Sequence, residues 1–183
     1  MPHCPWYIGY FLINPLRAFL QNPSEILAPY VRAGAVVFEP GPGMGFFTLE
    51  LARLVGSKGH VYVSDIQPQM LRNLERRATK ANVISQIKTR LVKEDSLGVD
   101  DLEGQVDFVL SFAVTHEMAD IGRFFAETSA ILKKGGCMLL AEPRLHVTAK
   151  TFSEELEFAQ KHGLRLVAQP LIWFSRTALL EKD

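Results

Sequence analysis

The chain has few cysteines, no excess of charge of either sign and no long apolar run. Its 183 residues include 2 Cys, and 20 Lys and Arg residues balance 20 Asp and Glu residues. Cys4 and Cys137 allow at most one disulfide, which a chain of this length does not need, so we expect a reducing cytoplasm. A neutral chain lacks the cationic excess with which proteins attract phosphate groups. Nucleic acid is therefore not an expected partner.

A membrane-spanning segment and a signal peptide are also missing from the sequence. No stretch of about 18 consecutive apolar residues occurs. The most apolar early stretch, residues 6–13, lacks the basic segment and the small-residue cleavage site of a signal peptide. We therefore expect a cytoplasmic protein without stable membrane insertion. At about 150 residues per domain, the length fits one domain with a short extension.

From residue 34 onward, short β-rich runs alternate with longer runs of helical periodicity, which is typical of strand-helix-strand crossovers. Strands are expected at residues 35–39, 60–65, 87–93, 106–111 and 137–142. Helices are expected at residues 46–55, 68–81, 121–132 and 151–162, the third of them ended by Gly135-Gly136. Two closing strands, 164–167 and 176–181, are joined too closely for a helical crossover and should be antiparallel. The pattern predicts an α/β fold with a doubly wound, mostly parallel seven-stranded sheet and a C-terminal antiparallel strand.

Residues 1–33 differ from the rest of the chain in their many prolines and aromatic residues. We expect one or two short helices there, beginning at Asn14-Pro15 and Pro23-Ser24, so that residues 1–33 form a helical cap and residues 34–183 the core. The cap carries a stripe of large apolar side chains: Trp6, Tyr7, Tyr10, Phe11 and Leu12. The stripe suits a lid over an apolar substrate pocket, a dimer contact or a membrane contact. Arg17 is the only Lys or Arg before residue 32, which disfavours the membrane.

A glycine-rich loop, Glu39-Pro40-Gly41-Pro42-Gly43-Met44-Gly45, joins the first expected strand to the first helix. Glycines at this point allow a sharp turn and let a ligand approach main-chain N–H groups at a helix N-terminus. The dinucleotide fingerprint Gly-x-Gly-x-x-Gly is not met, because Phe46 or Thr48 stands where its third glycine belongs. This argues against an NAD-dependent oxidoreductase. A tight turn without a ligand is the alternative.

Acidic residues follow the next two strands. Asp65 ends the second strand, 20 residues after Gly45, where a carboxylate can bind both hydroxyls of a ribose. Asp95-Ser96 follows the third strand, where a carboxylate can accept the amine of an adenine. Because the carboxyl ends of parallel strands border one crevice, the pattern favours an adenosine-type ligand. The alternatives are that Asp65 caps the helix beginning at Pro68 and that Asp95 lies in a solvated loop.

A histidine follows the fourth expected strand. His116-Glu117 lies just beyond it, and a neutral imidazole is suited to act as a general base, with Glu117 as a candidate to orient it. Packing or capping at the next helix is the alternative for His116. Glu142-Pro143 and His146 follow the fifth strand at the same edge, and their roles can be structural or catalytic.

These motifs together resemble class I S-adenosylmethionine-dependent methyltransferases, and within them the small branch similar to ubiquinone/menaquinone-biosynthesis and arsenite methyltransferases. The resemblance covers about residues 30–183. It rests on the Glu-x-Gly-x-Gly-x-Gly loop at 39–45, Asp65, Asp95-Ser96, the strand at 106–111, Leu132-Lys133-Lys134-Gly135-Gly136 and the closing antiparallel pair. It implies a Rossmann-like methyltransferase core.

The resemblance also implies where the cofactor binds. The amino acid part of S-adenosylmethionine would lie on the loop that contains Glu39, Gly41, Gly43 and Gly45. Asp65 would bind the ribose, and the adenine would lie between Ile66 and Asp95-Ser96. Ser111 and Phe112 would line the far wall. No metal is expected.

The implied reaction is in-line transfer of a methyl group to a small, apolar or aromatic acceptor, leaving S-adenosylhomocysteine. A hydroxyl or acidic carbon acceptor would need a base, for which His116 is the first candidate, whereas a thiolate or arsenite would not. A non-catalytic subunit that binds a partner through the aromatic N-terminus is the alternative, although the intact set of Gly45, Asp65 and Asp95 argues against it. We expect a monomer or a homodimer.

Overall fold

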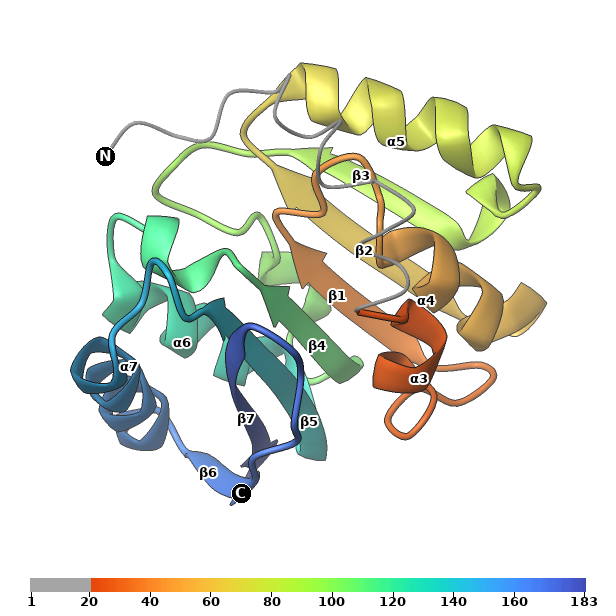
Figure 1. The fold of residues 1–183 in the computed structure, drawn as a ribbon. Coiled ribbons are helices and arrows are strands. Elements are labelled where there is room, and N and C mark those ends of the chain that lie inside the picture. The colour runs from red at the N-terminus through yellow and green to blue at the C-terminus, as the bar shows by residue number, and fades with distance from the viewer. Residues whose placement is uncertain (1–20) are drawn as a thin grey trace. The chain divides into compact units, whose positions relative to one another are not determined.

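The computed structural model describes residues 21–183 (Figure 1). The chain divides into two units, Met1–Val92 and Lys93–Asp183. The helix expected at Pro23-Ser24 is confirmed as α3, Pro23–Leu27, with the side chain of Asn22 accepting from the backbone N–H of Ser24. The helix expected at Asn14-Pro15 and the stripe at residues 6–12 lie outside the described residues. Within residues 21–183, no helix is long and apolar enough to cross a membrane.

Three parallel strands form the sheet of the first unit, in the order β3-β2-β1. They are β1 (Val36–Pro40), β2 (His60–Asp65) and β3 (Ile87–Leu91), and they agree with the expected strands to within two residues at each end. The β1–β2 register pairs Val37 with Val61 and Glu39 with Val63. Val37, Val61 and Val63 are fully buried, as expected for a parallel sheet covered by helices.

Two helices cover this sheet, α4 (Thr48–Val55) and α5 (Pro68–Lys80), with η2 (Gly56–Lys58) and η3 (Ile84–Gln86) as short connections. Figure 1 shows α5 running along β2 and β3. The helix begins at Pro68, since proline fits the first helical turn, where its missing N–H costs nothing. Leu71, Leu74 and Ala78 recur at spacings of three and four and form its buried face, which confirms the helix expected at 68–81.

The second unit contains four strands in the order β4-β5-β7-β6. They are β4 (Val106–Phe112), β5 (Leu132–Pro143), β6 (Leu164–Ala168) and β7 (Ser175–Lys182). Its helices are α6 (Ile121–Ile131) and α7 (Ala149–Lys161), with η4 (Asp100–Leu102) and η5 (Thr115–Glu117) as single turns. β4 and β5 are parallel, whereas β7 is antiparallel to both β5 and β6. The expected α/β class, the parallel majority and the closing antiparallel pair are confirmed.

The prediction that Gly135-Gly136 ends the helix expected at 121–132 is wrong. Helix α6 ends at Ile131, and Leu132 is already extended and paired with Val106 at the start of β5. The next ladder pair is Phe108 with Cys137, so the residues between Leu132 and Cys137 bulge out of the ladder. Gly135 adopts a φ of +73°, which glycine adopts at low cost. The glycines therefore serve a β-bulge and not the end of a helix.

Candidate active site

The glycine-rich loop of the first unit lies beside the end of β2. The backbone N–H of Gly41 donates to the carbonyl of Ser64 at 2.8 Å, so the loop begins next to Asp65. The sequence-predicted loop and Asp65 are therefore brought together. Gly41, Gly43 and Gly45 have φ values of +59°, +54° and +80°, which glycine adopts far more readily than other residues.

Two glycines of this loop differ in the space around them. A Cβ atom at Gly45 would lie 3.1 Å from Cγ of Leu74 on α5, so the backbone here approaches the helix closely. A Cβ atom at Gly43 would have no atom within 4 Å. The loop is thus packed closely against α5 at Gly45 and open at Gly43. A left-handed, open glycine turn in front of a helix suits a ligand that approaches main-chain N–H groups.

We expect Gly45→Ala to destabilise the protein more than Gly43→Ala. Both changes place a Cβ atom at positive φ, at a cost of about 1–2 kcal/mol. Only the change at Gly45 also forces Leu74 to move. Urea unfolding of the two variants measures the difference, and equal losses of stability would contradict the close approach to α5.

Two buried carboxylates, Glu39 and Asp65, lie at the ends of the strands beside the glycine-rich loop. Oε2 of Glu39 accepts from the Thr48 hydroxyl at 2.6 Å, which ties the end of β1 to the start of α4. Asp65 is 8% exposed, and its Oδ1 accepts from the backbone N–H of Gln67 at 2.8 Å. Gln67 is the N-cap residue of α5 and has no side-chain cap, so Asp65 braces the turn that leads into the helix. The half-buried Ile66 lies within that turn.

The sequence-predicted Asp95-Ser96 pair lies in the loop that opens the second unit. The side chain of Asp95 is exposed, whereas the hydroxyl of Ser96 accepts from the backbone N–H of Gly98 at 3.0 Å. The backbone N–H of Leu97 donates to Oε2 of Glu127 at 2.7 Å, which anchors the loop to α6. The solvated-loop alternative for Asp95 therefore stays open, and its adenine contact stays a prediction.

A tight turn follows β4 and places residues 114–117. Ala113 has a φ of +60°, which costs about 1–2 kcal/mol for a residue with a Cβ atom. Its backbone N–H donates to the carbonyl of Ala141 on β5 at 2.7 Å. The fully buried Ser111 shares a 2.9 Å hydrogen bond with the hydroxyl of Thr115. Backbone strain held in this way is common where a fold fixes functional groups.

The hydrogen-bond partner of His116 is Glu142, and not Glu117 as the sequence suggested. Glu142 is fully buried on β5. Its Oε1 accepts from the backbone N–H groups of Val114 and Thr115, at 3.3 and 2.9 Å, and its Oε2 pairs with Nδ1 of His116. The hydrogen bond to Glu142 raises the pKa of His116, burial opposes the rise, and the negative charges of nearby carboxylates add to it. Glu117 is exposed and is one of those carboxylates.

Two further groups surround this pair. The ring of His146 stacks on that of His116 with a centroid separation of 5.7 Å. Glu155 on α7 is 1% exposed, and neither of its carboxyl oxygens has a hydrogen-bond partner among the described residues. Burial raises the pKa of Glu155 to about 8, with the charge of Glu142 acting in the same direction and His116 in the opposite one. This pKa favours the neutral form of Glu155 at pH 7.

Glu155 was not among the residues predicted from the sequence. The sequence contains a pattern that indicates its burial. Phe152, Glu155 and Ala159 recur at spacings of three and four, and all three are buried on α7. A carboxyl group within the apolar face of a helix is unusual, since burial of an unpaired charge is costly. Periodicity alone would have placed Glu155 in the interior.

Exposed apolar side chains lie on two joined loops of the second unit, one of which contains His146. The backbone N–H of Arg144 donates to the carbonyl of Phe174 at 2.9 Å, and its Nε donates to the carbonyl of Ser175 at 3.0 Å. These bonds join the loop that contains His146 to the loop between β6 and β7. The exposed large apolar residues of the two loops, which we call the apolar rim, are Leu145, Leu171, Trp173 and Phe174.

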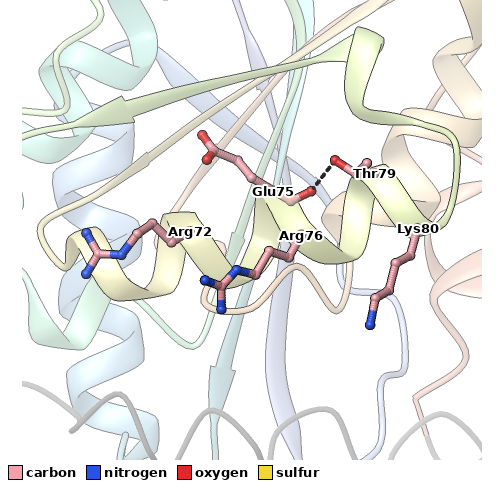
Figure 2. Close-up of a pocket in the computed structure, with 5 residues that line it drawn as sticks. All are labelled: Arg72, Glu75, Arg76, Thr79 and Lys80. Atoms are coloured by element: carbon pink, nitrogen blue, oxygen red, sulfur yellow. Dashed lines mark hydrogen bonds between the residues drawn. The ribbon is translucent and has the colours of Figure 1, made fainter.

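A separate hollow lies along α5, and Figure 2 shows the side chains that line it. Its lining residues are Arg72, Glu75, Arg76, Thr79 and Lys80. The Thr79 hydroxyl donates to the carbonyl of Glu75 at 2.9 Å, a bond within the helix. None of the sequence-predicted site residues lines this hollow. Among the described residues, no group of His, Cys, Asp and Glu is placed to hold a metal ion.

Comparison with known proteins gives a family and a fold. Residues 37–136 match a family model described as a methyltransferase domain. The chain is 28% identical over 112 residues to the ubiquinone/menaquinone biosynthesis C-methyltransferase UbiE of Marinomonas sp. (strain MWYL1), with 61% of this chain and 44% of that protein covered. It is 29% identical over 121 residues to the arsenite methyltransferase of Halobacterium salinarum, with 66% of this chain and 30% of that protein covered. The chain thus spans less than half the length of these two relatives.

A solved structure covers nearly the whole chain. The crystal structure of a SAM-dependent methyltransferase from Aquifex aeolicus has a TM-score of 0.86 at 19% identity, with 98% of this chain and 100% of that chain covered. The likeness confirms the Rossmann-like fold expected from the sequence.

Proposed function

Because the chain belongs to the class I S-adenosylmethionine-dependent methyltransferases, we propose that it transfers the methyl group of S-adenosylmethionine to a small, apolar or aromatic acceptor. The observation that carries the proposal is the open glycine turn beside Asp65, which combines main-chain N–H groups at a helix N-terminus with a buried carboxylate. The family match rules out the NAD-dependent oxidoreductase. S-adenosylmethionine is the cofactor of the family.

The residues present fit this cofactor. When bound, S-adenosylmethionine supplies an electrophilic methyl group on a sulfonium sulfur. In our proposal, Gly41, Gly43 and Gly45 hold its amino acid part, and Glu39 braces the loop through Thr48. Asp65 binds the ribose hydroxyls as a charged acceptor.

The resemblance to the family also assigns further residues to the cofactor and to the acceptor. We propose Ile66 as an adenine contact, and the roles that the sequence assigns to Asp95, Ser96, Ser111 and Phe112 stay proposals, each to be tested by its own substitution. Ser111 is held by Thr115, so its position depends on the same turn that places His116. His116 removes a proton from the acceptor, and Glu117 contributes a negative charge nearby.

The apolar rim supports an apolar or aromatic acceptor. Its four large side chains lie on two loops joined by Arg144, and one of these loops also carries His146. Exposed apolar clusters of this kind commonly mark binding sites. The names of the two relatives, one for ubiquinone and menaquinone biosynthesis and one for arsenite, agree with a small-molecule acceptor. The lid role of residues 1–33 stays a prediction.

The alternative is a subunit that binds the cofactor without catalysing transfer. It predicts cofactor affinity without turnover on any acceptor. The Glu142–His116 pair argues against this alternative. Burying a carboxylate costs free energy of desolvation, and a protein that only binds a partner has no need of a buried carboxylate held by three donors.

We expect Asp65→Ala to weaken S-adenosylhomocysteine binding by about tenfold to 150-fold, which corresponds to a charge-assisted hydrogen bond of about 1.5–3 kcal/mol. Isothermal calorimetry measures the loss. Glu103→Ala, which removes an exposed carboxylate from a turn, serves as the matched control and should bind like the wild type. Equal affinity of the wild type for NAD, or unchanged affinity of Asp65→Ala, would contradict the proposed cofactor site.

A further inference from the structure

The hydrogen bonds of Glu142 determine which nitrogen of His116 carries a proton. Oε1 of Glu142 already accepts from two backbone N–H groups, and Oε2 lies against Nδ1 of His116. A carboxylate can only accept hydrogen bonds, so Nδ1 must be the protonated nitrogen of the ring. In the neutral ring, the lone pair is then on Nε2. This is the tautomer that a general base acting through Nε2 requires.

Exposure differs sharply between the two partners. The His116 side chain is 20% exposed, whereas that of Glu142 is fully buried. No described residue forms a hydrogen bond with Nε2. The part of the pair that a small molecule can reach is therefore the imidazole and not the carboxylate.

Stability alone does not account for this arrangement. Removing a carboxylate from water costs several kcal/mol, and a well-packed apolar residue is often as good or better for stability. The backbone of Val114 and Thr115 also needs an acceptor, but a neutral side chain such as Gln could supply one. A carboxylate, in contrast, both fixes the ring tautomer and stabilises the imidazolium that forms when the ring takes a proton.

We propose that Glu142 is a positioning residue that makes His116 a base, and that the natural acceptor is therefore a protic group, namely a phenol-like or enol-like hydroxyl or an acidic C–H, rather than a thiolate or arsenite. The inference rests on the proposed methyl transfer and specifies the substrate class of that same site. Lone-pair donors that are already deprotonated need no such base.

The chemical step balances without any further reactant. The acceptor oxygen or carbon forms a bond to the methyl carbon while the bond from that carbon to the sulfonium sulfur breaks, and the electron pair of the broken bond goes to sulfur. The proton of the acceptor passes to Nε2 of His116. The resulting imidazolium is hydrogen-bonded to Glu142 on β5, and Glu117 on η5 and Glu155 on α7 are the other carboxyl groups that act on its charge. His146, stacked on the ring, is the other titratable neighbour.

The first test compares Glu142→Gln with Glu157→Gln, which removes an exposed carboxylate of α7. A Gln side chain at 142 can turn its NH₂ group toward Nδ1, which moves the ring proton to Nε2 and blocks the base. We expect kcat to fall by about a hundredfold to ten-thousandfold, which is the usual contribution of a general base; replacing the carboxylate behind a catalytic histidine by an amide acts through the same loss of the correct tautomer. Glu157→Gln should stay within about threefold of the wild type, because its exposed carboxylate has no part in the proposed site. Circular dichroism and S-adenosylhomocysteine calorimetry establish that both variants fold and bind.

The second test does not depend on turnover. NMR of ¹⁵N-labelled histidine should show Nδ1 of wild-type His116 protonated in the neutral ring, with a pKa above the usual 6.5, and Glu142→Gln should lower that pKa. An Nε2-protonated ring in the wild type would overturn the positioning role, even if Glu142→Gln fails to fold.

The third test addresses the acceptor class. Wild-type protein is offered S-adenosylmethionine with phenols, hydroquinones and β-dicarbonyl compounds on one side, and with small thiols and arsenite on the other. Methylation of the protic set with a loss in Glu142→Gln supports the inference. Methylation of thiols or arsenite alone, at a rate that Glu142→Gln leaves unchanged, overturns the inference but leaves the proposed function intact. Failure to bind S-adenosylhomocysteine would instead overturn the proposed function itself.

Discussion

Replacing His116 by alanine is expected to lower turnover by about a hundredfold to ten-thousandfold, which is the usual contribution of a positioned general base. The affinity for S-adenosylhomocysteine should remain near that of the wild type, because the residues proposed to hold the cofactor are unchanged. Steady-state kinetics on a protic acceptor, together with calorimetry, separates the two effects. His162→Ala serves as the matched control, since His162 ends α7 through its backbone and should be dispensable for turnover.

The pH profile gives a second readout for His116. Only the neutral imidazole can accept a proton, so the rate should fall on the acid side of the His116 pKa. The hydrogen bond to Glu142 raises that pKa, so the acid limb should lie above the usual 6.5. The limb should disappear in His116→Ala. A loss of tenfold or less with the acid limb intact would assign His116 to packing or capping.

The order of strands and helices follows from the spacing of apolar residues, because side chains alternate along strands and return every three to four positions on helices. This is why β2 at His60–Asp65 and α5 at Pro68–Lys80 agree closely with expectation. The bulge in β5 was not predictable in the same way. Two adjacent glycines after a helical pattern suit a helix end and a β-bulge equally, and only the pairing of Leu132 with Val106 decides between them.

The candidate site also contains features that the sequence predicts and features that it does not. The glycine-rich loop and Asp65 are signalled by local sequence, since each follows directly on its own strand. The pairing of His116 with Glu142 is not local: the residues are 26 positions apart and meet because β4 and β5 are parallel, with Phe112 opposite Ala141. The adjacent Glu117 is the nearest carboxylate in sequence, but its side chain is exposed and does not form the hydrogen bond with Nδ1. Long-range register therefore determines which acid orients the histidine.

Glu155→Gln is expected to stabilise the protein at alkaline pH and to change little at pH 5. The pKa of Glu155 rises from 4.5 to about 8 on folding, because burial disfavours the charged form. Between these values the folded state binds a proton that the unfolded state releases, so this group's contribution to stability is complete below 4.5 and is lost as pH rises through 8. Gln removes the titration, and the gain at pH 9 should be on the order of a few kcal/mol. Urea unfolding at pH 5, 7 and 9 measures it.

The neighbouring Glu157→Gln is the control for this pH dependence. Glu157 lies on the same helix with its side chain exposed, so its replacement should shift the free energy of unfolding by no more than about 0.5 kcal/mol at any of the three pH values. The groups that act on Glu155 from other elements are Glu142 and His116, and neither is altered in this comparison. If the difference between Glu155→Gln and the wild type is the same at pH 5 and pH 9, Glu155 does not carry its proton into the folded state. A stability difference that grows from pH 5 to pH 9 would show that Glu155 is a neutral carboxylic acid in the folded protein. Glu142 would then be the buried carboxylate whose charge orients His116.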